Sequence, residues 1–374
     1  MSERKFAHHM LKEIFENPQA VRDTVMHRVS AGRDRVVLDD FQLRDEDLRK
    51  VQHIAILASG TSRHAGLAGK IMIQQLAGVR VEVDFASEAQ YAGASCAKAD
   101  LTIVITQSGE TADTIAALAA AKASGAKTLA ICNVVGAAIA KSADAVIYTH
   151  AGPEIAIAST KAFTAQLAAL FLFAIYLGQL RGHLSDAEAR KQIADLCTLP
   201  EILTRSLDTS ARAEELAEKY FLASDFLFLG RGVHFPVALD GALKLKEVSY
   251  IHAEGYPAGE IKHGPYALVD ATMPLVCLAG KDPSDPGSVL RYTMTLQNMR
   301  DVVERLGRVI CVAVEGCDEV LKITNEVIFI PGAPELLLPM IEIVPLQFLA
   351  YYMALRRGLN VDSPRNLVKS VTSQ

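Results

Sequence analysis

Tryptophan is missing from the 374-residue sequence, and so are the signatures of several common binding sites. Neither the Gly-x-Gly-x-x-Gly loop of dinucleotide-binding proteins nor the Gly-x-x-x-x-Gly-Lys-Ser/Thr loop of ATP-binding proteins occurs. The basic residues form no block and the formal net charge is −5, which together argue against nucleic acid as a partner. If the chain binds a phosphate, we therefore expect that phosphate on a smaller molecule.

Cysteine pairs and targeting segments are absent as well. The six cysteines include no Cys-x-x-Cys pair, so we expect no metal site, no disulfide and a reducing, cytoplasmic compartment. Cys132, Cys277 and Cys311 lie in apolar, strand-like runs, where a cysteine is usually a small buried hydrophobic residue. The N-terminus has no apolar signal segment, and the apolar run 164–177 is too short to span a bilayer. We expect that run to be a buried core helix and expect no membrane association.

What the sequence does contain is a regular alternation of strands and helices. Half of the residues are hydrophobic, and the length allows two or three domains. Strand-like runs separated by helical stretches predict an α/β fold with a parallel, doubly wound sheet. We expect strands at 53–58, 79–85, 101–106, 127–132 and 145–149, a tight turn at 59–62, and helices from there to 76 and over 111–123.

The second half of the chain repeats this order, which indicates duplication of one α/β unit. We expect strands at 226–229, 274–279, 309–314 and 327–330, and helices at 236–251, 288–306 and 341–357. The predicted domains are an N-terminal helical segment (1–44), two tandem doubly wound domains (45–185 and 217–364) joined by a helical linker (186–216), and a C-terminal tail (365–374).

One segment of the second half concentrates ionisable groups. Lys244 and Glu247 stand three residues apart, so they share one face of the expected helix. Glycines and prolines between 255 and 265 then predict a loop that presents Glu260, Lys262 and His263. The segment is either an exposed ion pair followed by a polar loop or a proton-transfer site. In the second case Glu247 is the base, His263 the acid, and a lysine stabilises oxyanion charge.

Hydroxyl-rich loops follow two of the expected strands. In an open α/β sheet, ligands bind beyond the carboxyl ends of the strands, where residues 59–62 and 106–111 are placed. A third polar cluster, 158–161, precedes the apolar helix. Backbone N–H groups at helix starts, flanked by Ser and Thr, bind phosphate readily, but the same residues also cap ordinary helices. The recurrence of such loops beside glycines favours an anion site.

Five motifs then occur in a characteristic order. They are Ser-Gly-Thr-Ser from residue 59, Gln-Ser-Gly-Glu-Thr-Ala-Asp-Thr from 107, Ala-Ser-Thr-Lys-Ala-Phe-Thr from 158, Ala-Leu-Lys-Leu-Lys-Glu-Val-Ser-Tyr-Ile-His-Ala-Glu from 242, and Pro-Arg-Asn-Leu-Val-Lys-Ser-Val-Thr from 364. From about residue 11 to the C-terminus, the chain resembles the sugar isomerase (SIS) superfamily, and within it the isomerase domain of glutamine–fructose-6-phosphate aminotransferases. The resemblance implies two tandem SIS domains, a hexose phosphate substrate, no cofactor, and a homodimer with shared active sites.

The resemblance also implies roles for individual residues. Glu247 would move a proton between C1 and C2 with the help of Lys244, for which a carboxylate is suited. His263 would open the sugar ring from the neighbouring subunit, because imidazole titrates near neutrality. Lys369 would form an imine with the open-chain ketose. The implied substrate-binding residues are Ser59, Gly60, Thr61, Ser62, Thr106, Gln107, Ser108, Thr111, Ile157, Ser159 and Val368.

Two departures from the family pattern affect these expectations. The full synthases begin with a glutaminase domain whose nucleophile is a cysteine directly after the initiator Met, whereas Ser2 stands here. We therefore expect no glutaminase in this chain, and ammonia from solution or from a separate partner. Ser59 replaces a frequent cysteine and Val368 a frequent alanine, which leaves the preferred hexose phosphate open.

The expected activity interconverts fructose 6-phosphate plus ammonia and glucosamine 6-phosphate. The same residues would also serve a glucosamine-6-phosphate deaminase, so the direction in the cell stays open, as does any assembly beyond a dimer. A regulator that binds a sugar phosphate without catalysis uses the same fold. That alternative predicts loss of Glu247, His263 or Lys369, and all three are present.

Overall fold

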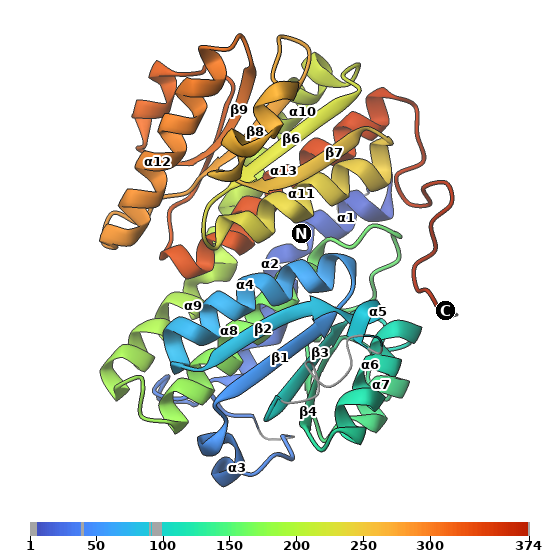
Figure 1. The fold of residues 1–374 in the computed structure, drawn as a ribbon, viewed down its shortest axis with the longest axis vertical. Coiled ribbons are helices and arrows are strands. Elements are labelled where there is room, and N and C mark those ends of the chain that lie inside the picture. Colours follow the sequence, from blue (N-terminus) through green and yellow to red (C-terminus); the bar gives the residue numbers. More distant parts are fainter. Residues whose placement is uncertain (1–5, 39–40, 90, 92–98, 373–374) are drawn as a thin grey trace. The chain divides into compact units, whose positions relative to one another are not determined.

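Two five-stranded parallel sheets form the framework of the chain (Figure 1). The computed structural model describes residues 6–38, 41–89, 91 and 99–372. The chain divides into two compact units. The first-sheet unit comprises residues 19–154, 161–200 and 368–374, and the second-sheet unit comprises residues 1–18, 155–160 and 201–367.

The first-sheet unit has the strand order β2-β1-β3-β4-β5, with every neighbouring pair parallel. Its strands are β1 (His53–Ala58), β2 (Arg80–Phe85), β3 (Leu101–Thr106), β4 (Lys127–Cys132) and β5 (Ala145–Tyr148). Its helices are α3 (Asp45–Lys50), α4 (Gly60–Ala77), α5 (Ala86–Ala89), α6 (Ala112–Ala123), α7 (Ala138–Ser142) and α8 (Lys161–Leu180). All six residues of β3 are buried, as expected for a parallel strand covered on both faces.

Right-handed crossover connections determine which face of the sheet each helix covers. The chain leaves β1 through α4 toward β2, but leaves β3 through α6 toward β4 in the opposite direction along the sheet. Helices α4 and α6 therefore cover opposite faces (Figure 1). Helix α8 packs on α4, where a Cβ at Gly69 would lie 2.8 Å from Leu170 Cδ1. Any larger residue at this position would require the Leu170 side chain to move.

The second-sheet unit repeats the same topology, with the order β7-β6-β8-β9-β10. Its strands are β6 (Asp225–Gly230), β7 (His252–Pro257), β8 (Pro274–Ala279), β9 (Arg308–Val314) and β10 (Val327–Ile330). Its helices are α1 (His9–Phe15), α10 (Ser210–Tyr220), α11 (His234–Ser249), α12 (Pro286–Val303) and α13 (Leu338–Arg356), while α2 (Asn17–Val25) and α9 (Asp186–Ser206) cross the unit boundaries. The prediction of two tandem, doubly wound parallel sheets is confirmed.

Two local predictions were wrong. Residues 59–62 do not form a separate turn, because helix α4 already begins at Gly60, whose φ of +51° suits a glycine. Residues 255–257, predicted as the beginning of a loop, belong to the edge strand β7, which pairs in parallel with β6. A Cβ at Gly255 would lie 2.8 Å from the Leu239 backbone of α11, so the glycine marks a close approach of helix and strand.

The apolar run 164–177 in α8 and three strand cysteines are buried as predicted. Helix α8 and the stretch Glu335–Arg356 are long and apolar enough to cross a membrane, yet 83% and 94% of their apolar windows are buried within the protein. Cys132, Cys277 and Cys311 are buried and free, and burial raises the pKa of the Cys277 thiol to about 12. Cys96 lies outside the described residues.

Candidate active site

The predicted hydroxyl loops lie beside each other at the carboxyl edge of the first sheet. Strands β1 and β3 are neighbours, and Ala58 pairs in register with Ile105. The residues that follow these two strands are therefore adjacent at the point where the strand order reverses, which is the usual ligand crevice of an open α/β sheet. We call residues 59–62, at the start of α4, and the loop 106–111 the hydroxyl cradle.

In the first loop of the cradle, the hydroxyls differ in exposure. Thr61 is buried, whereas Ser59 and Ser62 are partly exposed. The Ser62 Oγ accepts a hydrogen bond of 3.0 Å from Gln166 Nε2 on α8. Gln166 is itself buried, so it holds the Ser62 hydroxyl in a defined position at the rim of the crevice.

The second loop is shaped by its own hydroxyls and one glycine. Thr106 Oγ1 lies 3.2 Å from Thr111 Oγ1 and accepts the N–H of Gly109, also at 3.2 Å. Gly109 has a φ of +73°, and a Cβ there would lie 2.4 Å from Ala137 Cβ. Gln107 and Ser108 are partly exposed at the tip, where the Ser108 Oγ accepts the N–H of Glu110.

The structure also bears on the alternative that these residues merely cap helices. Ser59 is the N-cap of α4 and Thr111 the N-cap of α6, yet in the described part of the chain neither side chain accepts a capping hydrogen bond from its helix. Ordinary N-caps make such a bond. The Ser59 and Thr111 hydroxyls are thus not used to cap their own helices.

The C-terminal tail contributes its predicted residues to the same unit. The Ala112 N–H, at the first position of α6, donates to the Val371 carbonyl oxygen at 3.0 Å, so the tail lies against the end of the cradle. Lys369 Nζ is 2.7 Å from Glu154 Oε2. Val368 is exposed beside it.

The predicted base lies in the second-sheet unit, on helix α11. Lys244 Nζ is 2.5 Å from Glu247 Oε2; the lysine side chain is fully buried, whereas the glutamate side chain is 22% exposed. A solvated surface pair would expose both partners. The alternative of an exposed ion pair is therefore wrong for Lys244, and the accessible group of the pair is the carboxylate.

The remaining predicted residues also lie in the second-sheet unit. His263 is exposed at the end of the 3₁₀ turn η4 (Glu260–His263). Ile157 and Ser159 are partly exposed, and the Ile157 N–H donates to the Asp362 carbonyl oxygen at 3.0 Å. The structure thus brings together the cradle and Lys369 in one unit, and Lys244 with Glu247 in the other.

Sequence reasoning missed two sets of charged contacts with buried carboxylates. Glu154 contacts Lys369 across 215 positions of sequence, and only a carboxylate just before the 158–161 cluster hinted at it. His234, the first residue of α11, lies between Glu342 and Glu335 and is 2% exposed. Burial alone would lower the pKa of His234, but the two carboxylates outweigh burial and raise it to about 9.

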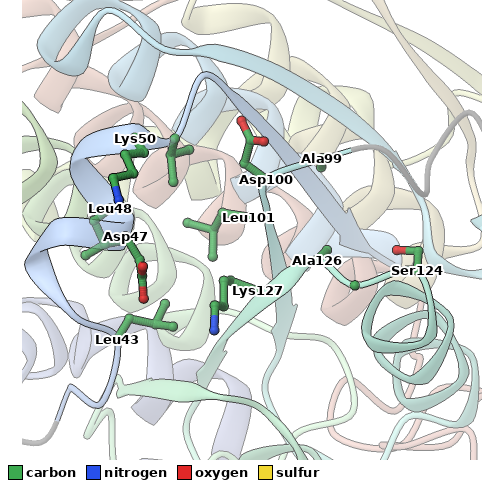
Figure 2. A pocket seen from close by; sticks show the side chains of 12 residues that line it. Leu43, Asp47, Leu48, Lys50, Ala99, Asp100, Leu101, Ser124, Ala126 and Lys127 are labelled. Atoms are coloured by element: carbon green, nitrogen blue, oxygen red, sulfur yellow. The ribbon is translucent and has the colours of Figure 1, made fainter.

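A pocket of about 470 Å³ lies at the other edge of the first sheet (Figure 2). It is lined by Asp47 and Leu48 of α3 and by Leu101 and Lys127, which begin β3 and β4. These are the amino ends of the strands, opposite the carboxyl ends that carry the cradle. Because ligands of parallel sheets bind at carboxyl ends, we do not assign the predicted chemistry to this pocket.

Comparison with known proteins identifies the family of the chain. The SIS domain family matches residues 47–176 and 221–357. The glutamine–fructose-6-phosphate aminotransferase (isomerizing) of Chlorobaculum tepidum is 47% identical over 98% of the chain, which spans 58% of that relative's length. The C-terminal domain of the glucosamine–fructose-6-phosphate aminotransferase of Francisella tularensis is 36% identical, with a TM-score of 0.91 over 97% of the chain and 100% of that domain. The glucosamine-6-phosphate deaminase of Thermotoga maritima, 22% identical with a TM-score of 0.72 over 97% of the chain and 99% of the deaminase, shares the fold.

Proposed function

Because the chain belongs to the SIS domain family, we propose that it is a sugar-phosphate isomerase that interconverts fructose 6-phosphate plus ammonia and glucosamine 6-phosphate. The names of the relatives from Chlorobaculum tepidum and Francisella tularensis support this substrate class. The structural observation that carries the proposal is the Lys244–Glu247 pair, in which a buried ammonium faces an accessible carboxylate. A protein that only binds sugar phosphates has no need of such a pair.

The phosphate of the substrate would bind in the hydroxyl cradle. Helix starts offer N–H donors and a favourable dipole to an anion, although the first N–H of α6, at Ala112, already donates to the Val371 carbonyl oxygen. We assign Ser62, Gln107, Ser108 and Thr111 to the phosphate oxygens, with Ser59, Gly60, Thr61 and Thr106 forming the wall of the cradle. Ile157, Ser159 and Val368 would meet the sugar hydroxyls, and these assignments are part of the proposal.

Glu247 would take the proton from one carbon and return it to the adjacent carbon. A single carboxylate can serve both atoms if it is accessible to the substrate, and the partial exposure of Glu247 supports that role. The Lys244 ammonium would hold Glu247 in position and stabilise negative charge on the substrate oxygen as the enediol forms.

Two further groups complete the proposed reaction. Lys369 would form an imine at C2 of the open-chain ketose, which makes the adjacent C–H more acidic. His263, exposed on its own chain, would open the sugar ring in the site of a second copy in a homodimer. No step of this sequence draws on a metal or an organic cofactor.

The test is turnover by the purified chain. Fructose 6-phosphate with ammonium chloride should yield glucosamine 6-phosphate, and Glu247→Gln should abolish the yield. We expect ammonium to supply the nitrogen in this reaction. Release of ammonia from glucosamine 6-phosphate without the forward reaction would instead assign the deaminase. Tight sugar-phosphate binding without turnover in either direction would assign a regulator. The free, buried cysteines support a cytoplasmic setting for the enzyme.

A further inference from the structure

Glu154 is a buried carboxylate whose two oxygens face different partners. Oε1 accepts the backbone N–H of Ala162 at 3.1 Å, in the first turn of helix α8. Oε2 lies 2.7 Å from Lys369 Nζ. The side chain of Glu154 has no exposed surface, whereas that of Lys369 is 25% exposed. The carboxylate is thus enclosed, whereas the lysine that it contacts is partly exposed.

We propose that Glu154 is a positioning residue for Lys369, which fixes the amine at the cradle and exchanges a proton with it during imine formation. This inference rests on the proposed function, because it assumes that Lys369 attacks the ketose carbonyl. It adds a residue that neither the motifs nor the implied roles include.

The surroundings of Glu154 favour a fixed, ionised carboxylate. A buried carboxylate is costly unless charge and hydrogen bonds compensate it. The start of α8 supplies an N–H group and the positive end of a helix dipole, and Lys369 supplies a cation. Another lysine, the buried Lys161, places Nζ 3.6 Å from the Cβ position of Gly152, two residues before Glu154.

Because Oε1 is held by α8, the position of Oε2 is fixed as well. Lysine has a long, flexible side chain, and Lys369 sits in a tail without regular secondary structure. The tail itself is held at Val371 by Ala112. Contact with Oε2 therefore provides the second constraint, which selects one position of Nζ among the many that the side chain can reach.

The proton balance of imine formation matches this arrangement. The resting ammonium passes one proton to Glu154 Oε2, and the neutral amine forms a bond to the carbonyl carbon C2 while the C=O π electrons move to oxygen. A second proton then moves from nitrogen to that oxygen. Glu154 returns its proton to the resulting hydroxyl, which leaves as water as the nitrogen lone pair forms the protonated imine. One ammonium and one carbonyl thus give one protonated imine and one water.

The charge next to Glu154 is the same before and after imine formation. Nitrogen carries one positive charge in the ammonium and one in the protonated imine. The enclosed carboxylate therefore has a cationic partner before and after the reaction, and favours the charged imine over its neutral form. A purely structural ion pair would not require an accessible amine.

The experiment compares Glu154→Gln and Glu154→Asp with Asp144→Asn. The control removes the carboxylate partner of Lys122 in the same unit, 2.9 Å away, and lies outside the proposed site. Borohydride traps fructose 6-phosphate on Lys369, and peptide mass spectrometry gives the trapping rate. We expect trapping to slow about 10²-fold or more in Glu154→Gln, to recover partly in Glu154→Asp, and to stay at the unmodified rate in Asp144→Asn. Binding of glucitol 6-phosphate, which has no carbonyl, should be unchanged.

A second readout does not depend on the reaction. Trinitrobenzenesulfonate labels reactive amines, so Lys369 should be labelled several-fold faster once Glu154→Gln removes the charged partner that holds the amine. Equal trapping rates in Glu154→Gln and the unmodified chain would overturn the inference, as would equal labelling rates. If the unmodified chain binds glucitol 6-phosphate but traps no substrate, the imine in the proposed function fails, and the labelling rates still decide the Glu154–Lys369 pairing. Should Glu154→Gln not fold, Glu154→Asp carries both readouts.

Discussion

The buried His234 gives the second-sheet unit a pH-dependent stability that can be measured. Its Nδ1 lies 2.8 Å from Glu342 Oε1, and its Nε2 lies 3.5 Å from Glu335 Oε1. Arg291 Nε donates to Glu335 Oε1 at 2.7 Å. Burial alone would raise the pKa of Glu335, but His234 and Arg291 outweigh burial and lower it to about 2. Two carboxylates thus hold a protonated imidazole at the start of α11. We expect the substitution His234→Gln, which keeps hydrogen bonding but removes the charge, to weaken this unit.

The size and sign of the effect follow from the pKa values. The pKa of His234 is about 9 in the folded protein, against 6.5 for an unperturbed histidine. Since the folded value is the higher one, the protonated form stabilises the fold. This contribution is complete below pH 6.5 and is lost as the pH rises through 9. At about 1.36 kcal/mol per pH unit, the interval corresponds to about 3 kcal/mol.

Hydrogen exchange of the α11 amides, corrected for the intrinsic rate at each pH, measures the local free energy of opening. Unmodified protein should exceed His234→Gln by about 3 kcal/mol at pH 6, and the difference should shrink to a small fraction by pH 9. His252→Gln, at an exposed histidine paired with Asp225, is the control and should show no such convergence. A constant difference between pH 6 and 9, or an NMR titration of His234 with a midpoint at or below 6.5, would refute the reasoning.

Three predictions concern the proposed active site. Ser108→Ala with Thr111→Ala should raise KM for the sugar phosphate far more than it lowers kcat, because each lost hydrogen bond to a charged phosphate costs about 1.5–3 kcal/mol; an unchanged KM would move the phosphate elsewhere. Lys369→Arg keeps the charge but cannot form an imine, so borohydride should leave no adduct, and an adduct on another residue would contradict the role of Lys369. Mixed dimers of Glu247→Gln and His263→Asn should regain activity if His263 acts across subunits, whereas inactive heterodimers would contradict that arrangement.

Much of the fold was predictable because parallel sheets are encoded by local patterns. Strands β3, β4, β8 and β10 begin and end where their apolar runs predict, since nearly all of their residues are buried. Strand β7 escaped prediction because it lies at an edge and contains Gly255 and Pro257, residues that usually indicate a loop. Residues 252–257 form a strand because they pair with β6, and this pairing cannot be seen in the local sequence pattern.

In the candidate site, too, local features could be predicted from the sequence and long-range contacts could not. The cradle could be predicted because its hydroxyls are contiguous in sequence and follow strands. The role of Glu154 could not be predicted, because it depends on a contact with Lys369, which is 215 positions away in the sequence. His234 and Glu342 are likewise 108 positions apart, and either one alone looks like an ordinary polar helix residue.

The central claim is that this chain moves a proton between C1 and C2 of a hexose phosphate with Glu247 as the base. Fructose 6-phosphate incubated with the chain in deuterated water should acquire deuterium at C1, detected by proton NMR. Glu247→Gln should slow this exchange by about 10²- to 10⁴-fold while binding of glucitol 6-phosphate is retained. Exchange at the unmodified rate in Glu247→Gln, or no exchange by a chain that binds the sugar phosphate, would contradict the claim.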